Sequence, residues 1–246
     1  ISLKHDIEYL FPLTDLEIDV LDRNRAVFKQ NRIVLCMPSS QTLAIARNKY
    51  VLYKTFEYDD LVPSISTYLS GEVPITLLPA IAKPYNGRSS EGVLRISNVK
   101  ELEEVSSKSG YIFQEIIEGP VFTVDYIRNS YTDKDFSIVR EELLRTKNGA
   151  GTTVRMSNDM SLKRLVSHIG NMIQVNGCIN MEFIQSKGKY YLIDINPRFS
   201  AGVAFSHMAG YNMVLNHLNC FIVQDIQAPV LYQEQIITKR YREEIL

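Results

Sequence analysis

Residues 190–202, YYLIDINPRFSAG, carry side chains whose types and spacing suit the binding of a hard cation. Asp194 and Asn196 lie two positions apart in an apolar strand, so they share one face of it, and Ile193 and Ile195 are expected on the opposite, buried face. Carboxylate and amide oxygens are ligands that Mg²⁺ accepts, with Mn²⁺ as a close substitute. The segment therefore predicts a cation site next to a strand end.

A second strand, residues 180–185, leads into the first through a turn at 186–188, and together they predict a β-hairpin. In a register with an even residue sum, Glu182 lies opposite Leu192 and diagonal to Asp194, within roughly 7–8 Å on the same face. Two carboxylates and an amide, with no His or Cys nearby, favour magnesium. Taken alone, the DINPR motif also fits a half-exposed acidic strand that ends at a proline turn.

The polar turn at residues 85–92, YNGRSSEG, connects two short predicted strands and lacks the spacing of a P-loop. Gly87 and Gly92 allow the backbone to approach a ligand. Ser89 and Ser90, together with main-chain N–H groups, can donate hydrogen bonds to phosphate oxygens, and Lys83 just before the turn supplies a positive charge. An ordinary solvated hairpin loop explains the same residues equally well.

Five motifs occur in an order that resembles the ATP-grasp superfamily. They are Lys49 in RNKYVLYK, Lys83 in AKP before a Gly/Ser turn, QEIIEG at 114–119, NMEF at 180–183 and DINPRFSAG at 194–202. The likeness covers roughly residue 14 to the C-terminus and is greatest to the carbamoyl-phosphate-synthase-like and carboxylate–amine ligase branch. It implies an α+β, ATP-grasp fold, in which two α+β lobes grip ATP.

The resemblance also implies roles for particular residues. Lys49 and Lys83 match the two basic residues that contact the ATP phosphates, and the loop residues Asn86, Gly87, Ser89, Ser90 and Gly92 match a segment that closes over the triphosphate. Gln114, Glu115 and the Ile117 backbone match the hinge that reads adenine. Glu182, Asp194 and Asn196 match the magnesium ligands, and Arg198, with Lys83, matches the catalytic groups that steady the transferred phosphoryl group.

The activity implied is that of an ATP- and Mg²⁺-dependent ligase, which activates a small-molecule carboxylate as an acyl phosphate for attack by an amine. One alternative is phosphorylation of bicarbonate or carbamate, as in carbamoyl-phosphate synthase. A non-catalytic nucleotide-binding module is another, because Val121 stands where many members carry a polar residue for the ribose. Asn48, Asp194 and Ala201 also depart from the commoner residues, but the metal-binding oxygens remain.

The elements that must position these residues are mixed in type, which favours an α+β fold. Helices are expected over residues 14–30, 40–54, 98–110, 162–177 and 212–221, and strands over 33–37, 79–84, 93–96, 111–117, 122–129, 137–146, 180–185, 190–196 and 235–245. Residues 1–38 are predicted to be the remnant of the α/β domain that precedes an ATP-grasp domain. Residues 39–246 then form the ATP-grasp domain, with a small lobe near 75–120 and a large lobe near 121–246.

Composition narrows the remaining possibilities. The 246 residues are 45% hydrophobic and 22% charged, which is typical of a soluble globular chain with a sizeable core. A net charge of −1 provides no overall electrostatic attraction for nucleic acid or an anionic membrane. The spacing of Cys36, Cys178 and Cys220 does not suggest paired cysteines, which favours reduced thiols and a cytoplasmic protein. A homo-oligomer is left open. Ile1 opens the chain in place of Met, which indicates a fragment.

Overall fold

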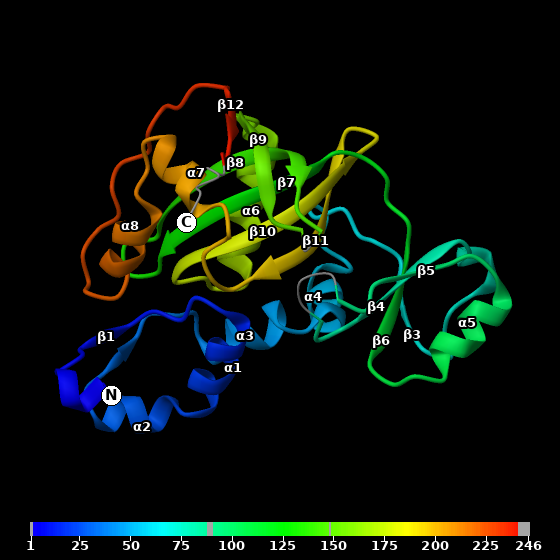
Figure 1. The fold of residues 1–246 in the computed structure, drawn as a ribbon, viewed down its shortest axis with the longest axis horizontal. Coiled ribbons are helices and arrows are strands. Elements are labelled where there is room, and N and C mark those ends of the chain that lie inside the picture. Colours follow the sequence, from blue (N-terminus) through cyan, green and yellow to red (C-terminus); the bar gives the residue numbers. More distant parts are fainter. Residues whose placement is uncertain (1, 88–90, 148, 241–246) are drawn as a thin grey trace, which may run out of the picture.

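The computed structural model describes residues 2–87, 91–147 and 149–240, and Figure 1 shows their arrangement. The largest unit is an antiparallel six-stranded sheet in the order β11-β10-β7-β8-β9-β12. Its strands are β7 (Val121–Asn129), β8 (Lys134–Arg145), β9 (Gly151–Ser157), β10 (Gly177–Ser186), β11 (Lys189–Asn196) and β12 (Ile236–Thr238). This sheet supplies most of the polar residues of the site described below.

Helices bury the apolar side chains of this sheet. Helix α6 (Met160–Met172) packs Leu162, Val166 and Ile169 into the largest hydrophobic core, whose sheet members include Val124 and Ile195. Helices α7 (Val203–Met208) and α8 (Met213–Asn219) close a second core. The apolar stripe at helical spacing in α6 thus determines which side of the helix meets the sheet.

A smaller sheet has the order β3-β6-β4-β5 and lies to the right in Figure 1. Its strands are β3 (Thr67–Leu69), β4 (Ala80–Pro84), β5 (Leu94–Ile96) and β6 (Tyr111–Glu115). Helix α5 (Val99–Ser106) covers it and contributes Leu102 and Val105 to their shared core. Asn98 caps α5 by accepting a hydrogen bond from the Glu101 N–H, as its sequence pattern predicts.

The N-terminal segment, blue in Figure 1, contains a 3₁₀ turn, two parallel strands and the first helices. Its elements are η1 (Ser2–His5), β1 (Tyr9–Leu10), α1 (Asp15–Arg23), α2 (Arg25–Gln30) and β2 (Val34–Leu35), followed by α3 (Ser40–Ala46) and α4 (Lys49–Phe56). The predicted capping box is present, because Thr14 accepts from the Glu17 N–H and Glu17 accepts from the Thr14 N–H. This box fixes where α1 begins.

Several sequence-based boundaries were wrong. The helix expected over 14–30 divides at Asn24, and the helix expected over 40–54 divides at Arg47 and Asn48. The first segment ends at Ala46 with Arg47 as its C-cap, and Asn48 caps the second, since it accepts hydrogen bonds from the N–H groups of Tyr50 and Val51. Strand β9, helix α7 and β3 lie where no element was predicted. The predicted terminal strand is confirmed only as β12, and residues 241–246 lie outside the described residues.

The hairpin forms, but in a different register from the predicted one. Its turn consists of Lys187 and Gly188, both with positive φ, which pairs Ser186 with Lys189. That register alone would place Glu182 opposite Ile193. The ladder shifts by one residue after Phe183, so Glu182 lies directly opposite Asp194. The β-bulge therefore brings the two carboxylates closer together than the predicted diagonal would.

The bulge also changes the environment of Ile193. This side chain was expected to be buried beside Ile195, but it lines the cleft described below, and only Ile195 is in the core. A bulge leaves one residue without a cross-strand partner and tilts the strand locally. Side chains of β11 therefore do not alternate strictly between the two sheet faces at Ile193, and its predicted burial was wrong.

The three cysteines are free and buried, as expected. His217 is also buried and structural: it accepts from the Cys178 N–H at 2.7 Å through Nδ1 and donates to the Cys36 carbonyl at 2.9 Å. Burial lowers the pKa of His217 to about 4, so this ring is neutral at ordinary pH. Within the described part of the chain, no helix has the length and apolar character needed to cross a bilayer.

Candidate active site

A cleft of about 550 Å³ lies between the two larger sheets. Its walls come from β4 and β6 on one side and from β7, β8, β10 and β11 on the other, with the loop after β11 and the start of α4. A cavity of this size suits a nucleotide or another ligand of similar bulk. The lining includes ten of the predicted site residues: Lys49, Lys83, Gly87, Gln114, Glu115, Ile117, Glu182, Asp194, Asn196 and Arg198.

Cross-strand pairing sets a row of polar residues on the sheet face that forms the cleft floor. Asp194 pairs with Glu182, Glu182 with Thr123, and Thr123 with Arg140, so one row crosses four strands. A second row joins Asn196 to Asn180 and Asn180 to Asp125. The Asn196 amide donates to Asn180 Oδ1 at 3.2 Å. The register thus gathers residues that are up to 71 positions apart in the chain.

The two predicted carboxylate ligands each hold a cation. Glu182 accepts from Arg145 at 2.7 Å, and Asp194 accepts from Lys49 at 2.6 Å. Burial raises the pKa of Glu182, Arg145 opposes that shift, and the nearby Asp194 charge adds to it. Two like charges on facing residues, with Cβ atoms roughly 4.5–5.5 Å apart, need positive charge between or around them.

This donor set fits one magnesium ion. Two facing carboxylates and the Asn196 amide offer oxygen ligands only, and Mg²⁺ commonly takes one or two carboxylates and completes its shell with water and phosphate oxygens. Within 2–87, 91–147 and 149–240, no three His, Cys, Asp or Glu side chains are arranged so that they could hold a metal ion by themselves. A closed protein cage is therefore absent there, and the ligands present suit a metal shared with a bound phosphate.

Lys83 contacts the backbone of the bulged residue, Ile193. Its Nζ donates to the Tyr53 hydroxyl at 3.1 Å and to the Ile193 carbonyl at 3.3 Å. Burial lowers the pKa of Lys83 to about 8, although Asp194 and Glu182 act in the opposite direction. Among the residues that the structure describes, this ammonium has no direct carboxylate partner, and a phosphate oxygen could take that place.

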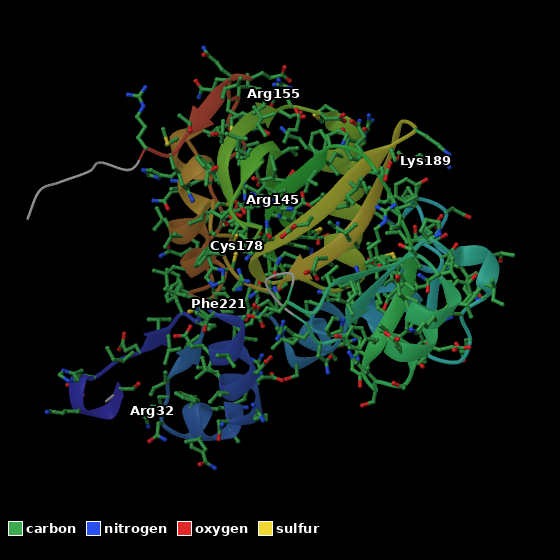
Figure 2. All side chains as sticks on the ribbon, turned by 45° about the vertical axis from the view of Figure 1, so that its right-hand side comes forward. Arg32, Arg145, Arg155, Cys178, Lys189 and Phe221 are labelled. Carbon is green, nitrogen blue, oxygen red and sulfur yellow. The ribbon has the colours of Figure 1, made fainter. Side chains whose placement is uncertain are left out.

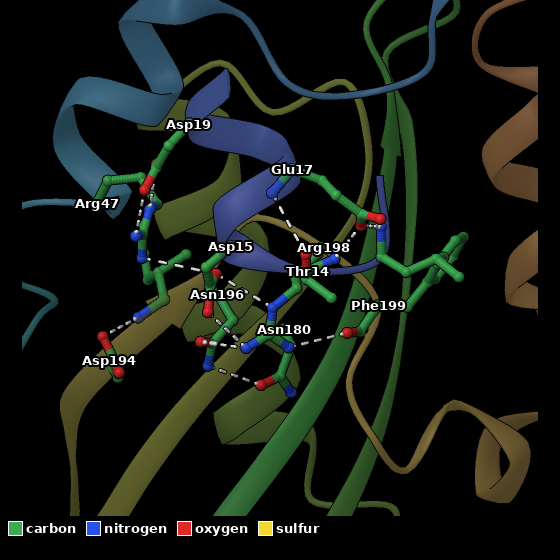
Figure 3. Close-up of polar contacts among 12 residues, drawn as sticks. Thr14, Asp15, Glu17, Asp19, Arg47, Asn180, Asp194, Asn196, Arg198 and Phe199 are labelled. Carbon is green, nitrogen blue, oxygen red and sulfur yellow. Dashed lines mark hydrogen bonds and ion pairs between the residues drawn. The ribbon is translucent and has the colours of Figure 1, made fainter. Parts of the chain in front are cut away.

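Arg198 is fixed by the N-terminal segment. Its guanidinium donates to both carboxylate oxygens of Asp15, at 3.1 and 3.0 Å, and to Asn196 Oδ1 at 3.3 Å (Figure 3). Asp15 is 5% exposed and also lies 3.6 Å from Arg47. Pro197 ends the strand just before Arg198, so the side chain reaches both the cleft and helix α1. No sequence pattern predicted that Arg198 would pair with Asp15.

The residues predicted to read adenine lie in and after β6. Gln114 is buried and donates to Thr67 Oγ1 at 2.7 Å, and Glu115 accepts from the Ser66 N–H at 2.9 Å. The strand ends at Glu115, two residues earlier than predicted, which leaves Ile117 in an irregular segment. These contacts stiffen the wall of the cleft, and the adenine role stays a prediction.

The predicted phosphate loop is described only in part. Gly87 lines the cleft, whereas Asn86 is exposed and, like Gly92, does not belong to the lining. Ser89 and Ser90 lie outside the described residues. Gly92 has φ of +71° and a Cβ there would approach Pro84 to 2.9 Å, so its glycine identity has a local structural reason.

Three cleft residues were missed or undervalued. Arg140, whose position a solvated hairpin end explains equally well from the sequence, lines the cleft, whereas Arg155 pairs with Glu141 across strands β8 and β9. Glu142 and Arg145, both in β8, were not identified at all; Figure 2 labels Arg145 over the strands of the large sheet. The two-residue spacing of Arg140 and Glu142 on a strand was the available signal, because it places both on one face.

Comparison with known proteins establishes the family. A family model described as the ATP-grasp domain matches residues 46–202, well over half of the chain, so the chain belongs to the ATP-grasp family. The family and the α+β fold predicted from the motifs are thereby confirmed. No curated protein was found with significant sequence similarity to the chain.

Solved structures share the fold at low sequence identity. Biotin carboxylase from Campylobacter jejuni, in a βγ-ATP complex, superposes with a TM-score of 0.79 at 16% identity over 92% of this chain and 57% of its own. The biotin carboxylase domain of Hydrogenobacter thermophilus 2-oxoglutarate carboxylase, with MgADP and bicarbonate, gives 0.77 at 16% over 92% and 56%. N5-carboxyaminoimidazole ribonucleotide synthetase from Thermotoga maritima gives 0.65 at 18% over 82% and 56%. The chain thus spans just over half the length of these proteins.

Proposed function

We propose that the chain is an ATP- and Mg²⁺-dependent ligase that activates a carboxylate as an acyl phosphate and joins it to an amine. The observation that carries this proposal is the polar row of the cleft floor, in which Asp194, Glu182 and Arg140 are aligned across the sheet. Membership of the chain in the ATP-grasp family supports the use of ATP. The MgADP bound to one structural relative supports the use of Mg²⁺.

The residues of the cleft have different roles in phosphoryl transfer. Glu182, Asp194 and Asn196 would hold Mg²⁺, which screens the charge of the ATP phosphates when bound. Lys83 and Lys49 supply fixed positive charge, and Lys49 exchanges its contact with Asp194 for a phosphate oxygen. Arg198 is preorganised by Asp15 to stabilise charge that develops on the transferred group.

The chemistry balances in two steps. A carboxylate oxygen attacks the γ-phosphorus of ATP, the bond to the β-phosphate oxygen breaks, and ADP leaves with the electron pair. The amine nitrogen then attacks the acyl carbon, the carbon–oxygen bond to phosphate breaks, and phosphate leaves while the nitrogen loses a proton. The products are an amide, ADP, phosphate and that proton.

A defined reaction mixture tests the proposal. Protein is incubated with ATP, Mg²⁺ and a panel of carboxylates and amines, and ADP, phosphate and any amide are measured. We expect ADP release that needs both a carboxylate and an amine. ADP release that needs bicarbonate would support carbamate or bicarbonate phosphorylation instead, and nucleotide binding without turnover would identify a non-catalytic module.

A further inference from the structure

We propose that Glu142, supported by Arg140, forms the subsite that binds the acceptor as a primary ammonium cation. The inference rests on the proposed ligase function and assigns the amine to one end of the same cleft. Both residues line the cleft, and their side chains are each only 2% exposed. The subsite therefore consists of buried charges that face a ligand cavity.

The charged groups around Arg140 and Glu142 are unequal in number. Arg140 donates to Asp125 at 2.8 Å, to Glu142 at 3.3 Å and to Ser200 at 2.9 Å, so one cation serves two carboxylates. Burial would lower the pKa of Arg140, but Asp125 and then Glu142 more than offset it and the pKa is raised. The cluster thus contains one guanidinium for two carboxyl groups. By contrast, Lys49, Arg145 and Arg198 each meet their own carboxylate.

Two carboxylate oxygens lack donors. Glu142 Oε2 and Asp125 Oδ1 are buried and have no hydrogen-bond partner among the residues that the structure describes. A buried carboxylate oxygen without a donor costs free energy, and an ammonium ligand supplies both the donor and the charge. Of the two residues, Glu142 is the one that lines the cleft, so we assign the ligand contact to it.

The backbone leaves room for this carboxylate. A Cβ on Gly151 would lie 1.8 Å from Glu142 Oε2, so glycine at this position permits the observed placement. Arg140 lies two strands from Glu182 in the polar row, roughly 10 Å away at ordinary strand spacing. An ammonium held at Glu142 loses one proton, which the Glu142 carboxylate accepts, before its nitrogen attacks an acyl group formed in the same cleft.

A direct binding measurement tests the subsite without catalysis. Methylammonium is the probe, tetramethylammonium is the control that lacks N–H donors, and binding is measured by saturation-transfer NMR. Glu142→Gln should weaken methylammonium binding by on the order of 10- to 100-fold, the scale of a charged hydrogen bond. The matched variant Glu141→Gln alters the neighbouring carboxylate that pairs with Arg155, and it should stay within about twofold of the unmodified protein. Equal binding to both variants, or none to the unmodified protein, would overturn the subsite.

A kinetic comparison separates this inference from the ligase function. Hydroxylamine is a neutral nucleophile under mildly alkaline conditions and traps acyl phosphates as hydroxamates. Glu142→Gln should keep hydroxamate formation while the KM for methylammonium rises at least tenfold. Loss of both reactions in folded protein contradicts an acceptor role, whereas no hydroxamate from the unmodified protein rejects the ligase function alone. Gly151→Ala, which displaces the Glu142 carboxylate, should reproduce the KM effect if Glu142→Gln does not fold.

Discussion

At the residue scale, the cleft brings together side chains whose charges depend on one another. Glu182 and Asp194 face each other, and each holds a cation that a metal and phosphates would replace. Removing both carboxylates by Glu182→Gln with Asp194→Asn should abolish Mg²⁺-dependent turnover, because the oxygen ligands lose their charge. Turnover is measured against Mg²⁺ concentration, with a melting curve to confirm folding. Activity equal to that of the unmodified protein would mean that the metal lies elsewhere.

Arg198 gives a second test at this scale. If it stabilises charge in the transition state, Arg198→Ala should lower kcat by on the order of 10²–10³-fold, with a much smaller change in the Kd for ATP. Its bidentate contact with Asp15 also predicts some loss of stability. Steady-state kinetics and melting curves on one preparation separate the two effects. Normal kcat in the folded fraction would leave Arg198 with a structural role only.

Lys83 predicts a pH dependence of ATP binding. Its pKa of about 8 lies below the ordinary lysine value, so the cation is present below that pH and is lost as the pH rises through it. A bound triphosphate should raise the pKa again, and binding near pH 8 should take up about half a proton. Calorimetry in two buffers of different ionisation enthalpy measures this uptake. Lys83→Met is the control, and equal uptake by that variant would exclude Lys83 as the source.

At the element scale, helix α6 depends on a close contact with β7. A Cβ on Gly170 would lie 2.1 Å from the Tyr126 ring, so Gly170→Ala forces the helix away from the sheet. Alanine gains about 1 kcal/mol of helix propensity, but overpacking costs about 1–3 kcal/mol, and we expect net destabilisation. Denaturant unfolding measures it. A more stable variant would show that α6 can move without cost.

The sequence predicted helices and strands better than it predicted how the strands pair. The apolar stripe of α6 and the caps at Thr14 and Asn98 are local patterns, and the structure confirms them. The bulge at Ile193 is not local, because it depends on how a hairpin fixed at its turn accommodates one extra residue. The motif order likewise indicated the family, but nothing near Arg198 in the sequence points to Asp15.

The same limit explains the missed cleft residues. Arg140 and Glu142 are seen as site residues only when β8 is placed two strands from β10. Their spacing on the strand was visible, yet a solvated hairpin end fits it too. The proposed division at residues 38 and 39, and the lobe limits near 75 and 120, stay predictions.

At the scale of the whole molecule, Asp15 links the N-terminal segment to the active site. Asp15→Asn removes the charge that orients Arg198 and should lower kcat by on the order of tenfold to 10²-fold, since small displacements of a reacting group are costly. The Kd for ATP should change little. Asp19→Asn is the control, because Asp19 accepts from Arg47, whereas the carboxylate that Arg198 contacts in the described part of the chain is Asp15. Equal kcat for the two variants would show that the segment does not position Arg198.

The acyl phosphate is the central claim for the molecule as a whole. Transfer of the γ-phosphoryl group to a carboxylate leaves one carboxylate oxygen in the phosphate that is finally released, because the acyl carbon–oxygen bond is the one that breaks. The tracer experiment uses the ¹⁸O-labelled carboxylate that supports ADP release, with ATP, Mg²⁺ and amine, and mass spectrometry of the phosphate. We predict one ¹⁸O atom in each phosphate formed. Phosphate that carries no label, in a reaction that consumes ATP, would contradict the mechanism.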